Sequence, residues 1–371
     1  MTPERARELL ESIRGRRVLL VGDLMMDEWV IGSVKRISPE APIPVVAVPL
    51  TQQARTHKPG GAGNVAAILL GLGARVRVLG VVGEDELGER LLADLGGRGA
   101  DVSGVLRDSS RPTSHKMRIL AGRQQLLRVD TESTEPLAEG LAVRLREELR
   151  AGLSEAEVVL AADYAKGVLS EVSLPGELIG QARARGVPLC ADPKPENIDL
   201  FRGASLVSPN AAEALQAIGP ANSQATTGGS SGAAGDDTGS LPDDLPPDVA
   251  RAGRLLRERL EAEAVFVTMG DAGIAVFPRE GATVLIPARR FTPPGEGDAL
   301  GATVVGDGTG CGDAVSAAAA LTLAAGSSYQ EAAELANAAG GVVSRYVGVY
   351  SPHPAEIAAA FNPGSARNRQ R

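Results

Sequence analysis

Residues 307–313 read Asp-Gly-Thr-Gly-Cys-Gly-Asp and lead into residues 314–325, Ala-Val-Ser-Ala-Ala-Ala-Ala-Leu-Thr-Leu-Ala-Ala. This second stretch consists almost entirely of small apolar residues, which predicts a buried helix beginning just after the glycines. Glycines at a helix start leave backbone N–H groups open to an anion, and the helix dipole adds positive potential there. A carboxylate in the first turn, Asp313, would lie beside a bound phosphate and could take a proton from an attacking hydroxyl. The alternative is that Asp313 only stabilises the helix N-terminus; three alternating glycines between two aspartates exceed that need, so we favour the phosphate site.

Upstream of this loop, short apolar runs alternate with helical patterns. Helices are predicted over 63–72 and 87–95, and strands over 18–21, 75–82, 158–161, 189–191, 205–207, 265–268 and 273–277. This alternation indicates a mostly parallel sheet with helices on both faces. In such sheets ligands bind beyond the carboxyl ends of the strands, which is where Asp, Gly and Asn recur in this chain.

Several segments depart from the alternation. Residues 29–48 and 112–130 are extended and partly polar, and we predict that they form a small separate sheet that acts as a flap. Residues 219–248 are poor in large apolar side chains and are predicted to be a disordered insertion within one domain, 1–361. A second loop is predicted over 292–301, and residues 362–371 are expected to be frayed.

The composition bounds the class of protein. The chain has 371 residues, is 43% hydrophobic and carries a formal net charge of −8. That apolar share suffices for a buried core, and no run of about 20 apolar residues predicts a membrane span. The net acidity argues against a nucleic-acid partner. Two cysteines, Cys190 and Cys311, fit a reducing cytoplasm, so we expect a cytoplasmic protein without membrane contact.

The stretch 58–64, Lys-Pro-Gly-Gly-Ala-Gly-Asn, opens a predicted helix. Its spacing fits a dinucleotide fingerprint, but residues 52–58 do not read as the strand that this fingerprint requires. A dehydrogenase is therefore the weakest hypothesis. We prefer a substrate loop with Asn64 as a hydrogen-bond donor, and a purely structural turn fits the spacing as well.

Four further motifs have both a functional and a structural interpretation. Asn210 and Glu213 share a helix face and could reach a metal or phosphate, but a capping box explains the pair better. The 268–273 stretch could be only a hairpin turn. Residues 163–167 and 192–194 each place an aspartate and a lysine after a strand, where an ordinary surface ion pair is the alternative.

Other enzyme classes lack their motifs. The sequence has no G-x-x-x-x-G-K-[ST] loop and no G-x-S-x-G elbow, which argues against a P-loop enzyme and an α/β-hydrolase. Its three histidines are far apart in sequence and no Cys-x-x-Cys occurs, so no zinc site is predicted.

Taken together and in this order, the motifs resemble those of the ribokinase-like (PfkB) carbohydrate kinases from about residue 18 to residue 349. The resemblance implies an α/β fold, a three-layer α/β/α sandwich with a small β-sheet lid. Five stretches are similar to the D-glycero-β-D-manno-heptose-7-phosphate kinase branch in particular: 22–27, 36–42, 124–130, 163–167 and 192–194. Many relatives carry a second, nucleotidyltransferase domain with a His-x-Gly-His motif that this sequence lacks, so we expect a stand-alone kinase.

The resemblance also implies roles for individual residues. Asp313 matches the catalytic base, and Gly310, Cys311 and Gly312 match the anion hole, with Cys311 standing where the family usually has alanine. The implied nucleotide and magnesium residues are Asn210, Glu213, Thr268, Gly270, Gly273, Thr309 and Asn337, with Glu213 acting on Mg²⁺ through water. The implied sugar-binding residues are Asp23, Gly60, Gly61, Asn64, Asp163, Lys166 and Lys194. Asp307 matches a residue near a monovalent-cation site of some relatives, which makes K⁺ a candidate.

The leading hypothesis is an ATP- and Mg²⁺-dependent kinase that phosphorylates the C1 hydroxyl of heptose 7-phosphate on the way to ADP-heptose. An acceptor phosphate needs cations, for which Lys166, Lys194, Arg118 and Arg123 are candidates. The alternatives are a kinase of ribose, fructose or 2-keto-3-deoxygluconate, and a catalytically silent sugar-binding protein on the same fold. Flap strands often pair across a dimer in the family, so the resemblance implies a homodimer.

Overall fold

The computed structural model describes residues 1–122, 124–170, 173–219, 241–289, 308–346 and 348–362. Its larger sheet has the strand order β14-β13-β12-β11-β10-β9-β1-β5-β6. Pairing is parallel from β6 across to β12 and antiparallel between β12, β13 and β14. The strands are β1 Arg17–Gly22, β5 Arg75–Gly83, β6 Val105–Asp108, β9 Val158–Ala162, β10 Leu189–Asp192, β11 Leu206–Val207, β12 Ala264–Thr268, β13 Ile274–Pro278 and β14 Val284–Ile286.

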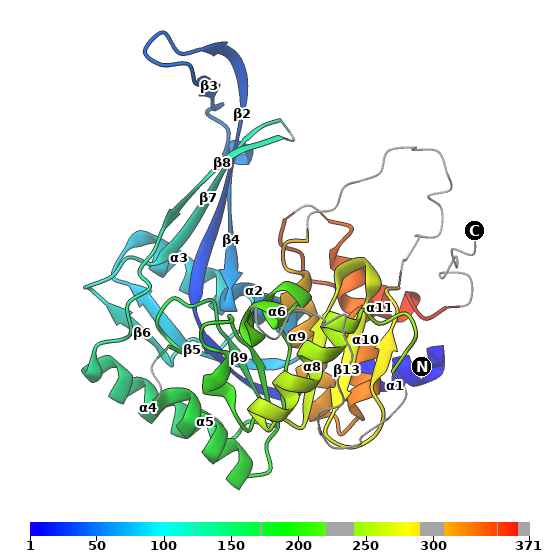
Figure 1. Cartoon of the computed structure of the whole chain (residues 1–371). Helices are drawn as coiled ribbons and strands as arrows, with labels where there is room; N and C mark the ends of the chain where they lie inside the picture. The colour runs from blue at the N-terminus through cyan, green and yellow to red at the C-terminus, as the bar shows by residue number, and fades with distance from the viewer. Residues whose placement is uncertain (123, 171–172, 220–240, 290–307, 347, 363–371) are drawn as a thin grey trace, which may run out of the picture.

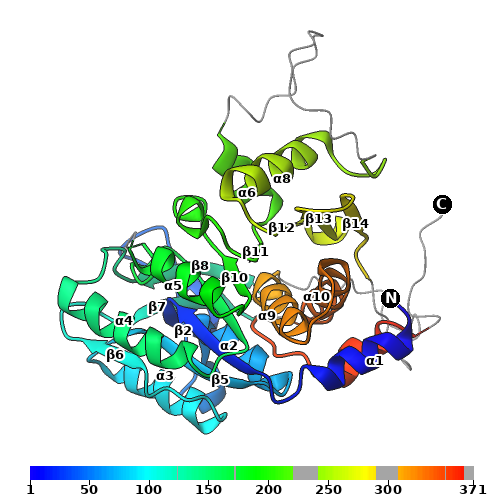
Figure 2. The same cartoon turned by 90° about the horizontal axis from the view of Figure 1, so that it is seen from below.

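Helices cover both faces of this sheet (Figures 1 and 2). The first layer holds α1 Pro3–Ser12, α2 Ala62–Gly71, α3 Glu86–Gly97, α9 Cys311–Ala324, α10 Tyr329–Val343 and α11 Pro354–Ala359. The second holds α4 Glu139–Leu153, α5 Ser173–Ala184, α6 Ala211–Ile218 and α8 Pro247–Leu260. Strand β1 illustrates how both faces of the sheet are buried. Val18 and Leu20 point into the first helix layer, whereas Leu19 and Val21 point into the second. The three-layer α/β/α fold is confirmed.

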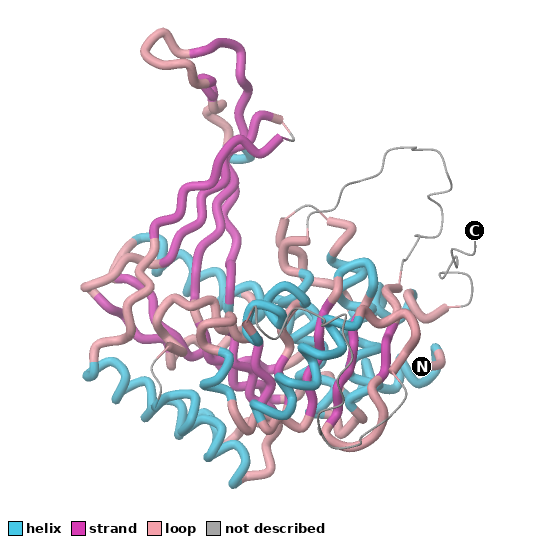
Figure 3. Tube along the Cα trace, viewed as in Figure 1, coloured by secondary structure: helices cyan, strands magenta, loops and turns pink. Residues whose placement is uncertain are grey.

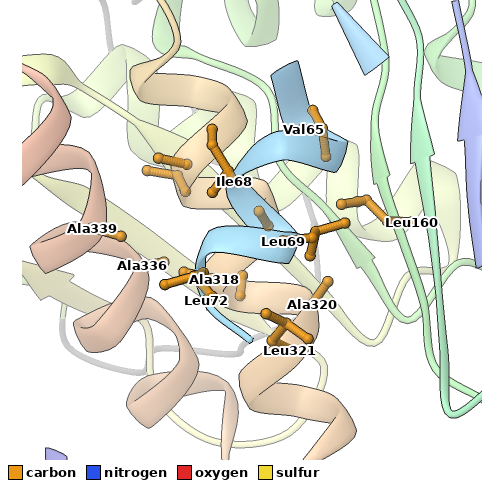
Figure 4. Close-up of a cluster of buried hydrophobic side chains, with 14 of the residues drawn as sticks. Val65, Ile68, Leu69, Leu72, Leu160, Ala318, Ala320, Leu321, Ala336 and Ala339 are labelled. Carbon is orange, nitrogen blue, oxygen red and sulfur yellow. The ribbon is translucent and has the colours of Figure 1, made fainter. Parts of the chain in front are cut away.

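Small residues let the helices of the first layer approach closely. Figure 4 shows Val65, Ile68 and Leu69 of α2, and Leu72 just after it, packed with side chains of two other helices. These are Ala318, Ala320 and Leu321 of α9 and Ala336 and Ala339 of α10. Alanine carries little bulk, so backbones can pack tightly at native density. This packing holds the N-termini of α2 and α9 side by side, and both N-termini reach the carboxyl edge of the sheet.

A second, five-stranded sheet projects from the body, and we call it the lid (Figures 1 and 3). It comprises β2 Leu24–Ile37, β3 Pro44–Ala47, β4 Arg55–Gly61, β7 Ser114–Ala121 and β8 Gln124–Thr131. Most of the described residues of both predicted flap segments, 29–48 and 112–130, lie in its strands, although β2 already begins at Leu24. The prediction that residues 52–58 do not form a strand was wrong, because β4 occupies most of that stretch and pairs with β2. As β4 runs in the lid and lies outside the parallel sheet, it still provides no dinucleotide fingerprint.

The remaining loops only partly fall within the described residues. Residues 220–240 of the predicted insertion, the 292–301 loop and residues 363–371 lie outside them. The insertion was predicted too long, because α8 begins at Pro247 and Leu245 just before it is buried. Short 3-10 turns complete the chain at Gln52–Ala54, Ile198–Phe201 and Gly270–Ala272. Within the described residues, no helix is long and apolar enough to cross a membrane.

Candidate active site

Polar side chains gather at the carboxyl edge of the larger sheet. Each stands at or just after the end of a strand: Asp23 follows β1, Asp163 follows β9, Asp192 ends β10, Asn210 lies beyond β11 and Thr268 ends β12. The N-termini of α2 and α9 meet at the same edge, as the Asn64–Asp313 hydrogen bond shows. Ligands of open α/β sheets bind in this position.

Asp313, in the first turn of α9, is held by two donors. The Asn64 amide Nδ2 donates to Oδ2 at 2.5 Å, and the Tyr164 hydroxyl donates to Oδ1 at 2.5 Å. Burial raises the pKa of the Asp313 carboxyl, and these two donors counteract that rise. The carboxylate is therefore fixed in orientation and poised to accept a proton above the ordinary aspartate range.

The glycine loop leads directly into Asp313. Gly310 is the N-cap of α9 with φ +79°, and a Cβ there would lie 2.9 Å from Asn64 Nδ2. Both facts require glycine, so the loop approaches Asn64 more closely than any side chain would allow. Thr309 precedes this cap, and Cys311 and Gly312 form the first turn. The loop thus presents the start of a helix beside the carboxylate, an arrangement suited to an anion. Asp307 lies outside the described residues.

A second acid lies next to Asp313. Burial, followed by the charge of Asp313, raises the pKa of Asp192 to about 7. Its Oδ2 accepts from the Ser316 hydroxyl of α9 at 3.0 Å. Lys194 counters the acids: its Nζ pairs with Glu213 Oε1 at 2.6 Å and lies 5.7 Å from the centre of the Tyr164 ring. The edge therefore combines several carboxylates with the ammonium of Lys194.

Asn210 and Glu213 form the capping box that the sequence favoured. Glu213 N–H donates to the Asn210 side chain at 2.9 Å, and Asn210 N–H donates to Glu213 Oε2 at 2.9 Å. Because Glu213 Oε1 also accepts from Lys194, the carboxylate is fixed at the carboxyl edge of the sheet. This arrangement satisfies the structural interpretation and leaves carboxylate lone pairs for a hydrated cation.

Asp23 and Asp163 hold the loop that carries Tyr164. Asp23 is 1% exposed, and its two oxygens accept backbone N–H groups of Tyr164, Lys166 and Val168 at 2.8–3.1 Å. Burial and the neighbouring Asp163 raise the pKa of Asp23 to about 6. Asp163, equally buried, accepts from Ala165 N, Lys194 N and the Asn197 amide. The geometry favours a positioning role for both over the sugar contacts that the resemblance implies.

The residues implied for the nucleotide lie on the far side of Asp192. Thr268 bridges to Asn210, and Gly270 and Gly273 form the tight turn between β12 and β13. A Cβ at Gly273, whose φ is +101°, would lie 2.0 Å from the Ile286 carbonyl oxygen, so the turn requires glycine. Asn337 is buried and donates to the Pro287 carbonyl at 2.7 Å, which ties α10 to the end of β14.

The lid joins the main body beside the site, since β2 begins directly after Asp23 and β4 ends directly before α2. A Cβ at Gly60 would lie 2.5 Å from Asp27 Oδ2, and Gly61, with φ +53°, would bring one within 2.7 Å of the Asp23 carbonyl. Both predicted glycines thus allow β4 to lie against the start of β2. Three of the proposed phosphate-binding cations already hold carboxylates: Arg118 pairs with Asp27, Lys166 with Glu132 and Lys194 with Glu213. Arg123 lies outside the described residues.

Sequence reasoning did not single out several residues that the structure brings to the site. Tyr164 stands inside the quoted 163–167 motif, but its contact with Asp313 spans 149 positions. Asp192 also lay in a quoted motif, whereas Ser316 was hidden in the small apolar helix. Trp29, the sole tryptophan of the chain, begins one segment of the predicted flap, but its place between Lys58 and Arg118 was not predicted.

The chain is similar in sequence to known proteins over most of its length. The family model described as pfkB family carbohydrate kinase matches residues 17–356. The chain is 38% identical to the bifunctional protein HldE of Geobacter metallireducens over 96% of this chain and 65% of that protein. It is 38% identical to the bifunctional protein HldE of Bradyrhizobium diazoefficiens over 94% of this chain and 63% of that protein. The chain thus spans slightly less than two thirds of the length of these curated relatives.

Solved structures share the fold at low sequence identity. Arabidopsis thaliana ribokinase complexed with ribose and ATP superposes with a TM-score of 0.66 at 19% identity, covering 94% of this chain and 100% of that one. Phosphofructokinase-2 from Escherichia coli in complex with potassium gives 0.68 at 19% identity, covering 94% and 98%. These likenesses show that the chain has a ribokinase-like fold.

Proposed function

Because the chain belongs to the pfkB family and is a carbohydrate kinase, we propose that it transfers the γ-phosphoryl group of ATP to the C1 hydroxyl of D-glycero-β-D-manno-heptose 7-phosphate. The branch-specific stretches 22–27, 36–42, 124–130, 163–167 and 192–194 support this acceptor, as does the similarity to bifunctional HldE proteins. The observation that carries the proposal is the carboxylate of Asp313, held by Asn64 and Tyr164 beside the glycine loop. The two-cysteine composition supports a cytoplasmic setting.

The proposed chemistry is a direct phosphoryl transfer. Asp313 accepts the proton of the acceptor hydroxyl while that oxygen forms a bond to the γ-phosphorus. The bond from the γ-phosphorus to the β–γ bridging oxygen breaks, and ADP leaves with that electron pair. N–H groups at the start of α9, around Gly310–Gly312, face the charge that develops on the transferred group. The lid excludes water from the reacting groups.

Mg²⁺ fits the residues present as a phosphate-borne ion. The described residues contain no cluster of three acidic, histidine or cysteine ligands, so the chain offers no cage made wholly of protein. Mg²⁺ commonly keeps several waters and is bound through one or two carboxylates together with substrate phosphates. We propose that Glu213, fixed by Lys194, orients water on that ion. When bound, Mg²⁺ supplies charge neutralisation on the phosphates. K⁺ binding near Asp307 stays a prediction.

The first experiment is ADP release from Mg-ATP against a panel of heptose 7-phosphate, heptose, ribose, fructose and 2-keto-3-deoxygluconate. Turnover that is highest with heptose 7-phosphate supports the proposal. Highest turnover with another sugar keeps the mechanism and rejects the acceptor. Sugar binding without ADP release would instead indicate the catalytically silent binding protein.

The contact between Tyr164 and Asp313 predicts a pH effect. The base works as a carboxylate, so activity falls as the pH drops through the raised pKa of Asp313. Tyr164→Phe removes the donor to Oδ1, which raises that pKa further and moves the acidic limb of kcat/KM upward. Hydrogen bonds to charged groups are worth about 1.5–3 kcal/mol, which corresponds to a shift of about one to two pH units. The measurement is kcat/KM from pH 5 to 9. Tyr329→Phe, at the start of α10, is the control. Superimposable profiles for wild type and Tyr164→Phe would contradict the role of Tyr164.

We also propose that the chain forms a homodimer through the lid. Most of the exposed large apolar side chains in the described residues belong to lid strands or their connections: Ile31, Val34, Ile37, Ile43, Leu50, Leu127 and Val129. Ile37 is 60% exposed and Ile43 is 57% exposed. Their concentration on one projecting sheet favours a protein interface there, because contiguous apolar surface is unfavourable in a monomer.

The lid interface has a direct test in light scattering. The wild type is expected to show twice the chain mass, and the Ile37→Lys/Ile43→Lys double variant a single chain, because buried unpaired lysines are costly at an interface. Val143→Lys, an equally apolar exposed position on α4, serves as the control and leaves the mass unchanged. A monomeric wild type, or a double variant that stays dimeric, would reject this interface.

A further inference from the structure

One face of the lid carries a line of charged residues around Trp29. In the strand register, Asp27 of β2 lies opposite Lys58 of β4 and Lys116 of β7, and Trp29 lies opposite Arg118. Residues paired across neighbouring strands share a face of the sheet. This face therefore brings Asp27, Trp29, Lys58, Lys116 and Arg118 together.

The cations on this face differ in how they are compensated. Arg118 pairs with Asp27 at 2.6 Å, and Lys116 pairs with Asp130 and Glu132 at 3.0 Å each. Lys58 is different: within the described part of the chain, its Nζ has the Val349 carbonyl at 3.0 Å and no carboxylate within ion-pair distance. Asp27, the cross-strand neighbour of Lys58, forms its ion pair with Arg118 instead. Burial, followed by the charge of Arg98, lowers the pKa of Lys58, as expected for an ammonium that lacks an anion.

The position of Lys58 relates it to the reacting groups. Its Nζ lies 5.9 Å from the centre of the Trp29 ring, and the Arg118 guanidinium lies 5.0 Å from the same ring. Val349, whose carbonyl accepts from Lys58, has its side chain 3.9 Å from the place of a Cβ on Gly310. Asp313 Oδ2 is 3.9 Å from that same point. One residue, Val349, thus separates the uncompensated ammonium from the glycine loop and the base.

We propose that Lys58 binds the phosphate group that the acceptor carries at the end remote from the reacting hydroxyl, with Trp29 and Arg118 forming the walls of that subsite. The inference rests on the proposed function, since it requires a phosphorylated acceptor. A phosphate dianion is the ligand that supplies the missing negative charge, and it replaces a neutral carbonyl as the partner of the ammonium. Lys116, Arg118, Lys166 and Lys194 would each have to leave a carboxylate to do the same.

The test compares a phosphorylated acceptor with its unphosphorylated counterpart. In Lys58→Met, KM for heptose 7-phosphate is expected to rise about 10- to 100-fold, the range for losing one charge-assisted hydrogen bond. KM for ATP and turnover of unphosphorylated heptose change little. Lys58→Arg restores most of the preference, which also shows that the position tolerates substitution. Lys35→Met removes a lysine from an exposed site on the same sheet and is the matched control.

Each other outcome overturns the inference in a distinguishable way. A wild type that prefers heptose 7-phosphate and a Lys58→Met variant that keeps this preference reject Lys58 while the proposed function stands. If Lys58→Met loses the same fraction of activity with heptose 7-phosphate and with unphosphorylated heptose, Lys58 only links β4 to Val349 and does not bind the phosphate. A raised KM for ATP alone assigns Lys58 to the nucleotide. A wild type that uses unphosphorylated sugars as well as phosphorylated ones rejects the subsite and the proposed acceptor together.

Discussion

Asp313→Asn is expected to reduce kcat by about 10²–10⁴-fold, the range for removing a general base. The amide keeps the shape of the side chain and can still bond to Asn64 and Tyr164 by reorienting, but it cannot take the acceptor proton. The measurement is steady-state ADP release with the best acceptor of the sugar panel. Nucleotide affinity should change little, because the N–H groups of the glycine loop belong to the backbone.

The interpretation of Asp313→Asn depends on an intact fold. Its thermal midpoint should match that of the wild type, and calorimetric binding of ADP should persist. A variant that folds, binds ADP and retains more than a tenth of the wild-type kcat would show that another group deprotonates the acceptor. Asp192 would then be the first candidate, because it lies beside Asp313 and its pKa is raised to about 7.

Asp23→Ala is expected to lower the free energy of unfolding by about 3 kcal/mol or more. Three backbone N–H groups, those of Tyr164, Lys166 and Val168, lose their acceptor, and each unsatisfied buried donor costs about 1–3 kcal/mol. Because this loop places the Tyr164 hydroxyl on Asp313, kcat should fall as well. Urea denaturation followed by circular dichroism measures the first effect, and ADP release the second.

Asp94→Ala provides the comparison for Asp23. Asp94 lies on α3 and makes an exposed pair with Arg98, so its removal should cost less than about 0.5 kcal/mol. An Asp23→Ala variant of normal stability whose KM for the sugar alone rises would reverse our assignment. It would favour the sugar contact that the family resemblance implies over the positioning role that the geometry favours.

The central strands could be predicted from sequence because burial on both faces leaves them nearly continuous apolar runs, as in residues 18–21. Strand β4 was missed for the opposite reason. Its first residues, Arg55 to Lys58, are polar and mostly half-exposed, since lid strands are not enclosed by helices. The start of α8 was missed because its anchors, Leu245 and Val249, are isolated apolar residues in a polar context.

The same contrast applies to the candidate site. Asp313 and Gly310 could be predicted because the motif that identifies them is contiguous in sequence: a glycine loop followed by an acid at a helix start. The donors to Asp313 come from α2 and from the loop after β9, and only the folded sheet brings them together. Lys58 lay inside a quoted motif, but its lack of a carboxylate depends on Arg118 having taken Asp27. Such a property belongs to the arrangement and cannot be assigned from spacing.

The topology of the lid has a consequence for how proteins of this architecture can diversify. The lid is formed by two excursions of the chain, one between β1 and α2 and the other between β6 and α4, whereas the glycine loop and Asp313 belong to a helix much later in the sequence. If the lid binds the acceptor as proposed, mutations that alter acceptor binding fall in different parts of the sequence from those that alter phosphoryl transfer. On this proposal, changes confined to the two excursions could alter which sugar is used without changing the residues of the glycine loop.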